Sequence, residues 1–239
     1  MSNGKRRGHP NVHAIVDGLN MQAAMISPHY TGLASALQEM VDADFSLEEA
    51  AWESRKNELI SAYGLGDTTG SDKPYAFSNG VAIIPVHGVL VNRFSHSWGY
   101  VTGYNFIRNQ YEAALKDEDV RAIVLDCNSP GGMVAGCFET ASLIYKNRDT
   151  KPTLSVVDSS SYSACYAIAS SAGKMMVVPS AGVGSIGVVA THVNIGPMLE
   201  KMGIEVSFIH AGKHKVDGNP YQALPDDVKK AIQASVDNG

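Results

Sequence analysis

Residues 122–132, with the sequence AIVLDCNSPGG, join a short apolar run to a turn that contains two glycines. Four apolar residues bounded by turn residues are typical of a buried strand. The turn, residues 128–132, precedes a helical pattern from Val134 to Lys146. Two glycines let the backbone approach a ligand closely, and N–H groups at a helix start favour negative charge. The loop could therefore hold an oxyanion, although an ordinary strand-to-helix turn also explains it.

The same alternation of apolar runs and helical spacing continues on both sides of this stretch. The pattern predicts strands at 81–86, 122–126, 153–157, 174–178, 186–190 and 205–209, and helices at about 107–115, 134–146, 162–172, 197–202 and 225–236. Strands that alternate with helices indicate an α/β fold with a largely parallel sheet. In such folds, functional groups collect in the loops beyond the carboxyl ends of the strands.

The N-terminal part of the chain has a different pattern. Residues 1–10 are expected to be disordered, and residues 11–64 are expected to be helical. A capping box at Ser46–Glu49 predicts a helix that ends near Tyr63, before Gly64. Residues 65–80 are rich in Gly, Ser, Thr and Asp and indicate a linker. We therefore divide the chain into an N-terminal helical extension with its linker, 1–75, and a main domain, 76–239.

Composition narrows the class of protein. Of the 239 residues, 44% are hydrophobic and 18% are charged, which predicts a globular core. The formal net charge of −5 argues against a nucleic-acid partner. We expect no membrane anchor, because no apolar run reaches the ~18–20 residues that span a bilayer. We expect no secretory signal, because the basic start Lys5–Arg7 is followed by residues 8–11, GHPN, and not by a continuous apolar region. The three cysteines have no framework spacing and indicate free thiols in a reducing compartment.

Two further loops carry groups that could do chemistry. Residues 159–166, SSSYSACY, place Ser163 between a predicted strand and a predicted helix. A serine there feels the positive end of the helix dipole, but N-capping explains a serine equally well. Cys165 in the same loop is a weaker nucleophile candidate, since small buried cysteines usually belong to the core. Residues 210–220, HAGKHKVDGNP, contain Lys215 and could equally be a solvated surface loop.

Taken together, these loops resemble the signal peptide peptidase A family of serine peptidases, and within it the phage lambda-like capsid assembly protease branch. The resemblance rests on residues 128–136, Ser163-Ala164, and the runs 184–188, 214–220 and 224–228, in that order. It covers the chain from about residue 80 to the end. It implies a Clp-protease/crotonase-like fold of repeated ββα units behind the N-terminal helical segment.

The same resemblance implies the roles of the site residues. Ser163 would be the nucleophile and Lys215 the general base of a Ser–Lys dyad. The oxyanion hole would consist of backbone N–H groups near Gly131 and Gly132, with that of Ala164. Ser185 would orient the lysine amine. The family implies neither a metal nor a cofactor.

A Ser–Lys dyad makes a specific physical demand. A lysine acts as a base only when it is neutral, and its ordinary pKa is ~10.4. The fold must therefore bury Lys215 in the assembled enzyme, and we predict that Asp217 points away from it. A Ser–His–Asp triad is the alternative, with His87, His192, His210 and His214 as candidates. His214 is the strongest of these competitors because it precedes Lys215.

The function expected from the resemblance is a phage or prophage capsid (prohead) maturation protease. Its substrates would be scaffold, portal or other head proteins and itself, and we expect a homo-oligomer in the host bacterial cytoplasm or inside the prohead. One alternative is a cytoplasmic signal-peptide-peptidase-like enzyme that degrades peptides. Two others are a crotonase-like acyl-CoA enzyme and a catalytically silent assembly module.

Overall fold

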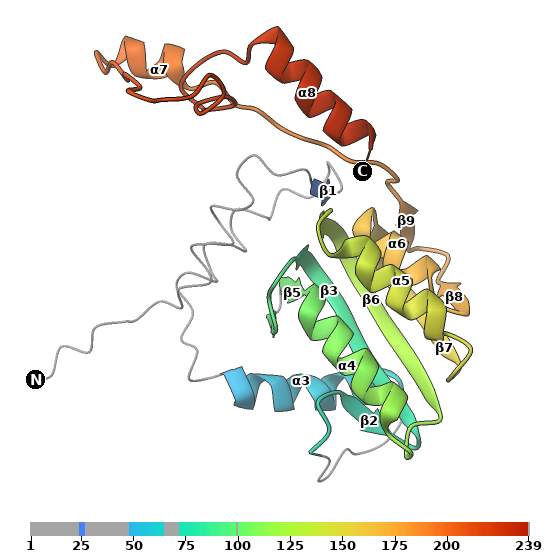
Figure 1. Cartoon of the computed structure of the whole chain (residues 1–239). Coiled ribbons are helices and arrows are strands. Elements are labelled where there is room, and N and C mark those ends of the chain that lie inside the picture. Colours follow the sequence, from blue (N-terminus) through green and yellow to red (C-terminus); the bar gives the residue numbers. More distant parts are fainter. Residues whose placement is uncertain (1–23, 27–47, 65–71, 99, 239) are drawn as a thin grey trace, which may run out of the picture.

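The computed structural model describes residues 24–26, 48–64, 72–98 and 100–238. Its centre is a β-sheet with the strand path β4-β5-β3-β6-β7-β8, and β1, β2 and β9 pair beside this path (Figure 1). The strands are β1 (Ala24–Ile26), β2 (Ala76–Ser78), β3 (Val81–Val91), β4 (Ser97–Trp98), β5 (Val101–Gly103), β6 (Ala122–Met133), β7 (Thr153–Tyr162), β8 (Lys174–Val177) and β9 (Gly182–Gly184). The helices are α3 (Glu48–Ala62), α4 (Tyr104–Lys116), α5 (Cys137–Asn147), α6 (Ala164–Ser170), α7 (Gly196–Lys201) and α8 (Asp226–Asp237).

The centre of the sheet is parallel. β6 pairs in parallel with β3 on one edge and with β7 on the other, and β7 pairs in parallel with β8 and β9. β1, β2 and β4 pair antiparallel. Parallel strands need crossover connections, which α4, α5 and α6 provide here. The predicted α/β class with a largely parallel sheet is confirmed.

The two faces of the sheet are covered by different helices. Successive side chains of a strand point to opposite faces. Ile84 and Leu125 are fully buried in the core that α4, α5 and α6 complete. Ile83, the neighbour of Ile84, is instead buried with Leu59 and Ile60 of α3 in a second, smaller core. Helix α3 therefore packs directly on the sheet.

Several predicted boundaries are wrong in an informative way. β6 and β7 run well past the predicted strand ends, so the turn 128–132 continues the strand β6. The predicted strands at 186–190 and 205–209 are absent from this described part of the chain, and β9 lies at 182–184 instead. An apolar run forms a strand only where a neighbouring strand can pair with it. The run at 186–190 follows β9, where the chain leaves the sheet, and the run at 205–209 lies beyond α7 (Figure 1).

The N-terminal predictions are partly correct. α3 ends at Ala62, close to the predicted end at Tyr63, whereas Ser46 of the capping box lies outside the described residues. β1 is a strand inside the segment 11–64 that the sequence pattern assigns to helix, and β2 falls within the predicted linker. In both places pairing with a strand of the main sheet overrides the local pattern.

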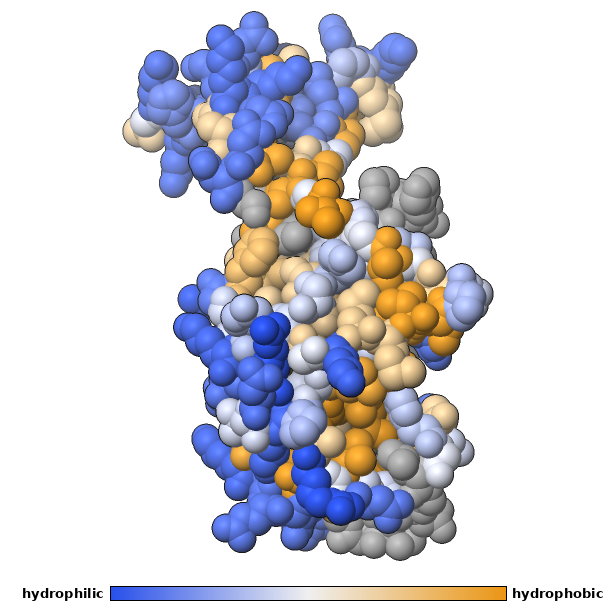
Figure 2. Space-filling view, turned by 90° about the vertical axis from the view of Figure 1, so that its right-hand side faces the viewer, coloured by the Kyte–Doolittle hydropathy of each residue, from blue (hydrophilic) through white to orange (hydrophobic). Residues whose placement is uncertain are grey.

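The C-terminal segment, residues 185–238, extends away from the sheet and is called the arm below. It contains α7 and α8 and lies apart from the compact α/β part, residues 72–184, called the body (Figure 1). The arm packs mainly on itself, since Ile195 N donates to Pro220 O at 2.7 Å and the rings of Phe208 and Tyr221 lie 5.9 Å apart. In Figure 2, apolar surface is visible where the arm meets the body.

Candidate active site

Ser163 lies at the junction between β7 and α6. It follows the last strand residue, Tyr162, and its carbonyl accepts the first helical hydrogen bond, from Ala167 N at 3.0 Å. Its backbone has φ 54° and ψ −117°, a positive φ that is rare for a residue with a side chain. Such strain persists only where the surroundings impose it, and it often marks functional sites. The side chain is 3% exposed, and Oγ lies 3.5 Å from Gly187 O.

Ser185 lies beside Ser163 in the backbone register. Tyr162 of β7 pairs with Gly184 of β9, so each of the two serines follows one member of this pair. The Ser163 N–H donates to Gly184 O at 2.7 Å. Ser185 also has a positive φ, of 56°. Sheet pairing thus brings together two serines that are 22 positions apart in the sequence, although their assigned roles stay predictions.

The three predicted oxyanion-hole residues lie near the ends of neighbouring elements: Gly131 and Gly132 near the end of β6, and Ala164 at the start of α6. Gly131 has φ 106°, and a Cβ at Gly132 would lie 1.9 Å from Leu90 O, so both positions require glycine. The Gly131 N–H donates to Ser129 Oγ at 3.0 Å, which holds the loop in shape. Ala164 is buried at the start of α6, directly after Ser163. The oxyanion-hole assignment stays a prediction.

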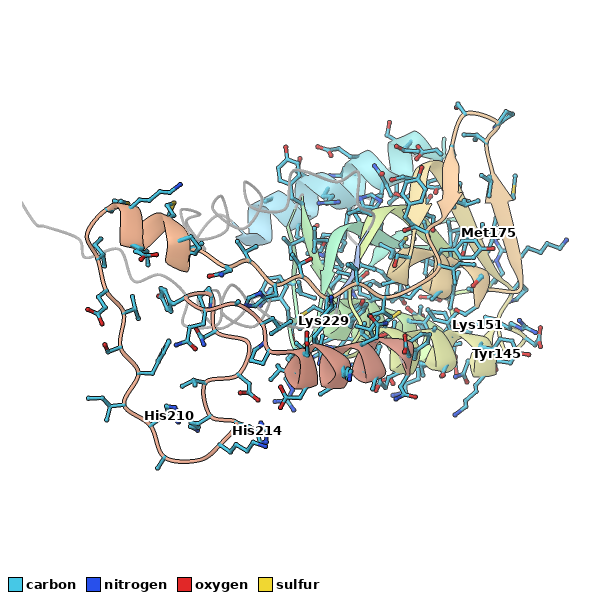
Figure 3. All side chains as sticks on the ribbon, turned by 90° about the horizontal axis from the view of Figure 1, so that it is seen from above. Tyr145, Lys151, Met175, His210, His214 and Lys229 are labelled. Atoms are coloured by element: carbon cyan, nitrogen blue, oxygen red, sulfur yellow. The ribbon has the colours of Figure 1, made fainter. Side chains whose placement is uncertain are left out.

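Lys215 lies in the arm, on the turn that follows Gly212, and its side chain is exposed. His214, the preceding residue, lies in a loop far from the body (Figure 3). The structure therefore does not bring Lys215 to the buried Ser163 within one chain. The Asp217 carboxylate is 2.7 Å from His214 Nδ1. The prediction that Asp217 points away from Lys215 concerns the assembled enzyme and stays a prediction.

The four histidines considered for a Ser–His–Asp triad occupy different surroundings. His192 Nε2 is 3.0 Å from Asn219 O and His210 Nδ1 is 3.1 Å from Gly212 O, both within the arm. His87, on β3, has both ring nitrogens engaged: Arg55 donates to Nδ1 at 2.6 Å, and Nε2 lies 2.8 Å from Asp126 Oδ2. An arginine can only donate, so Nδ1 accepts and Nε2–H donates to the carboxylate. His87 is therefore unsuited to take a proton from Ser163.

This polar cluster was missed by sequence reasoning. It joins α3 to the sheet through Arg55, His87 and Asp126, and Tyr63 completes it by donating to Asp126 Oδ1 at 2.8 Å. Burial opposes ionisation of Asp126, but the hydrogen bonds from His87 and Tyr63 and the charge of Arg55 hold its pKa below the usual range. Burial, together with Asp126, raises the pKa of Tyr63. The signal in the sequence was an aspartate directly after an apolar strand run.

The cysteines are buried and form part of the core. Cys165, the weaker nucleophile candidate, is fully buried on α6, and its sulfur accepts a hydrogen bond from Ser161 Oγ at 3.3 Å. The hydrogen bond with Cys165 and burial raise the pKa of the Cys127 thiol well above its ordinary value. Complete burial at both positions fits a packing role better than a reactive one. Within the described residues, no helix is both long and apolar enough to cross a bilayer.

Comparison with known proteins finds a family that matches the C-terminal part of the chain. Residues 145–239, which include Ser163 at the junction of β7 and α6, match the model of Peptidase family S49. The chain therefore carries a peptidase S49 segment. Its resemblance to serine peptidases of the signal peptide peptidase A type, predicted from the motifs, is confirmed.

Individual relatives extend the match beyond this segment. The chain is 43% identical over 180 residues to "Capsid assembly protease C" of Escherichia phage lambda, which covers 74% of this chain and 41% of that protein. It is 37% identical over 165 residues to "Head-tail preconnector protein GP5" of Enterobacteria phage P21, covering 68% and 33%. "Putative signal peptide peptidase SppA" of Enterococcus faecium is 26% identical over 184 residues, covering 73% and 52%. The chain thus spans less than half the length of the two phage relatives.

Proposed function

We propose that this chain is a serine endopeptidase with a Ser–Lys dyad that matures phage or prophage capsids. The proposal rests on one observation above all: Ser163 is held at a strained turn where β7 passes into α6. The similarity to a phage capsid assembly protease supports the substrate class, namely scaffold, portal or other head proteins and the chain itself. The host cytoplasm or the prohead would be its place of action.

The proposed reaction is acyl transfer. Ser163 Oγ attacks a peptide carbonyl while the neutral amine of Lys215 takes its proton. Backbone N–H groups near Gly131, Gly132 and Ala164 stabilise the oxyanion, and Ser185 orients the amine. The Lys215 ammonium formed in this way then protonates the leaving nitrogen, which returns the lysine to its neutral form, and water hydrolyses the ester.

An exposed Lys215 on the arm of one chain requires a second surface before it can act. We propose that a neighbouring copy provides it, so that Ser163 of one copy meets Lys215 of another. The arm carries exposed apolar side chains, among them Ile186, Met202 and Ile209, which such contacts would cover. We also propose that the sheet is the core of a Clp-protease/crotonase-like fold of repeated ββα units, with an N-terminal extension 1–75 and a peptidase domain 76–239.

A co-expression experiment tests the enzyme and its substrate class together. The chain is expressed with its cognate scaffold and capsid proteins, and cleavage is followed by mass spectrometry. Ser163→Ala and Lys215→Ala should each lower the rate of cleavage by a factor of ~10³ or more. Ser170→Ala, on the exposed side of α6, is the matched control and should cleave normally.

Two results would overturn the proposal. Cleavage by folded Ser163→Ala would exclude the nucleophile. A wild-type chain that leaves every head protein intact but binds acyl-CoA would favour the crotonase-like alternative, whose fold also stabilises oxyanions with backbone N–H groups.

A further inference from the structure

The short strand β1 pairs with the end of β6 at the predicted oxyanion loop. The register is antiparallel, with Ala24 opposite Met133, Met25 opposite Gly132 and Ile26 opposite Gly131. β1 comes from the N-terminal segment, more than 100 positions away in the sequence. A segment from outside the peptidase-like region therefore lies against the two glycines that the proposed mechanism uses.

The pairing of the other strands shows which edge of β6 is involved. On one edge, β3 stays paired as far as Leu90 opposite Gly132. On the other edge, β7 pairs only as far as Ser161 opposite Ser129 and then turns toward Ser163. Because each strand has two edges, β1 must occupy the one that β7 leaves. Residues 24–26 therefore continue the sheet at the place where the chain turns toward Ser163.

An edge with unpaired backbone groups binds extended peptides by strand addition. We propose that the edge of β6 at Gly131–Met133 is such a binding site for an extended peptide, and that Ala24–Ile26 is its intramolecular occupant. The N-terminal segment then competes with substrate for the same backbone groups. This inference deepens the proposed function and rests on it only for the identity of the competing peptide as substrate.

The tether and the length of β1 define how the competition works. A tethered occupant binds at a high effective concentration without needing strong contacts. A strand of three residues is short, however, and a peptide that pairs over a longer edge can displace it. An occupant that fills the site nine-tenths of the time weakens a competitor by about tenfold.

Peptide binding tests the inference without any cleavage. The full chain with Ser163→Ala is titrated against a fluorescent peptide with the sequence of residues 21–30, MQAAMISPHY. Met25→Pro, which removes a backbone N–H and disfavours strand pairing, should tighten binding about tenfold. Met25→Ala keeps the N–H and serves as the matched control, with unchanged affinity. Equal affinities for the proline and alanine variants would overturn the inference.

A reversible cross-link decides the matter if the proline variant does not fold. Ala24→Cys with Met133→Cys places two cysteines at paired positions, while the native cysteines at 127, 137 and 165 are buried. The oxidised form should lose peptide binding, and reduction should restore it. Binding that survives a verified cross-link, or failure of the pair to cross-link at all, would overturn the inference. Because the readout is binding, a failure of the proposed peptidase activity would leave this result standing.

Discussion

The body and the arm differ in how far their apolar side chains are buried. In the body, side chains such as Ile83, Leu90 and Ile123 are fully buried between the sheet and its helices. In the described arm, Val228 is the only hydrophobic side chain in the buried core, whereas Ile186 is 84% exposed and Ile209 is wholly exposed. The body thus has a core of its own, and the arm does not.

This difference bears directly on the active site. Exposing a large aliphatic side chain forgoes ~1.5–3 kcal/mol relative to burying it, so several on one segment indicate a surface that another molecule covers. The nucleophile candidate Ser163 belongs to the body, and the base candidate Lys215 belongs to the arm. Covering the arm and completing the dyad are therefore the same event in the proposed function.

Mixing two inactive variants gives the largest effect that follows from this comparison. If Ser163 and Lys215 meet between copies, Ser163→Ala and Lys215→Ala should be inactive alone and active together. Random assembly through a head-to-tail interface leaves roughly one quarter of the sites with both native groups. The measurement is cleavage of a head-protein substrate after the two variants are co-assembled.

Two controls make the mixing experiment decisive. Mixing Ser163→Ala with a double variant that lacks both groups should give no activity. Lys213→Ala, two positions from Lys215 on the same exposed turn, should be active without mixing. A mixture that stays inactive although both variants co-assemble would show that the dyad does not form between copies.

Placing a charge on the arm should separate assembly from folding. Ile209→Asp introduces a charge where the proposed neighbour must cover an apolar side chain. Losing ~1.5–3 kcal/mol of burial weakens self-association by about 10- to 100-fold. Sedimentation velocity measures the association, and Asn109→Asp on the exposed side of α4 is the matched charge control. Unchanged association of Ile209→Asp would place this side chain outside the interface.

The sequence predicted the body far better than the arm. The apolar runs at 81–86, 122–126 and 153–157 are strands because each has a parallel neighbour on both sides or at its edge. The equally apolar runs at 186–190 and 205–209 form no strand in this described region: the first has a single β-bridge residue, Val189, and the second has none. The local sequence pattern indicates that a segment can form a strand, and the segments packed beside it determine whether it forms one.

The candidate site shows the same division. Two signals were readable in the chain: Ser163 in its small-residue loop and the glycines at 131–132. The strained φ of Ser163 and the pairing that brings Ser185 beside it depend on register between distant strands. The cluster around Asp126 depends on how α3 packs on the sheet, and the spacing of residues in the sequence does not predict that packing.

Asp126→Asn should lower the stability of the body and leave the arm unchanged. The substitution removes the charge that accepts from His87 and Tyr63, and the expected loss is ~1–3 kcal/mol in the free energy of unfolding. Because the folded-state pKa of Asp126 is depressed, its contribution is present above the unfolded value of ~3.9 and is lost as pH falls below it. Urea unfolding at pH 7 and pH 3.5 measures both effects. The variant should depend less on pH than the parent, and Asp149→Asn, an exposed carboxylate, should behave like the parent.

Asp117→Asn should give the smallest effect, because this carboxylate is partly exposed at the edge of the body. Asp117 accepts hydrogen bonds from Lys73 and Tyr75, which lower its pKa to about 2. Solvent screening limits the expected loss to ~0.5–1 kcal/mol. The depressed pKa means that the stabilisation is complete above ~3.9 and disappears as pH falls toward about 2. Thermal unfolding followed from pH 7 to pH 2 should therefore show the variant and the parent converging at the acid end. A constant gap across that range would show that packing around Asp117, rather than its charge, carries the contribution.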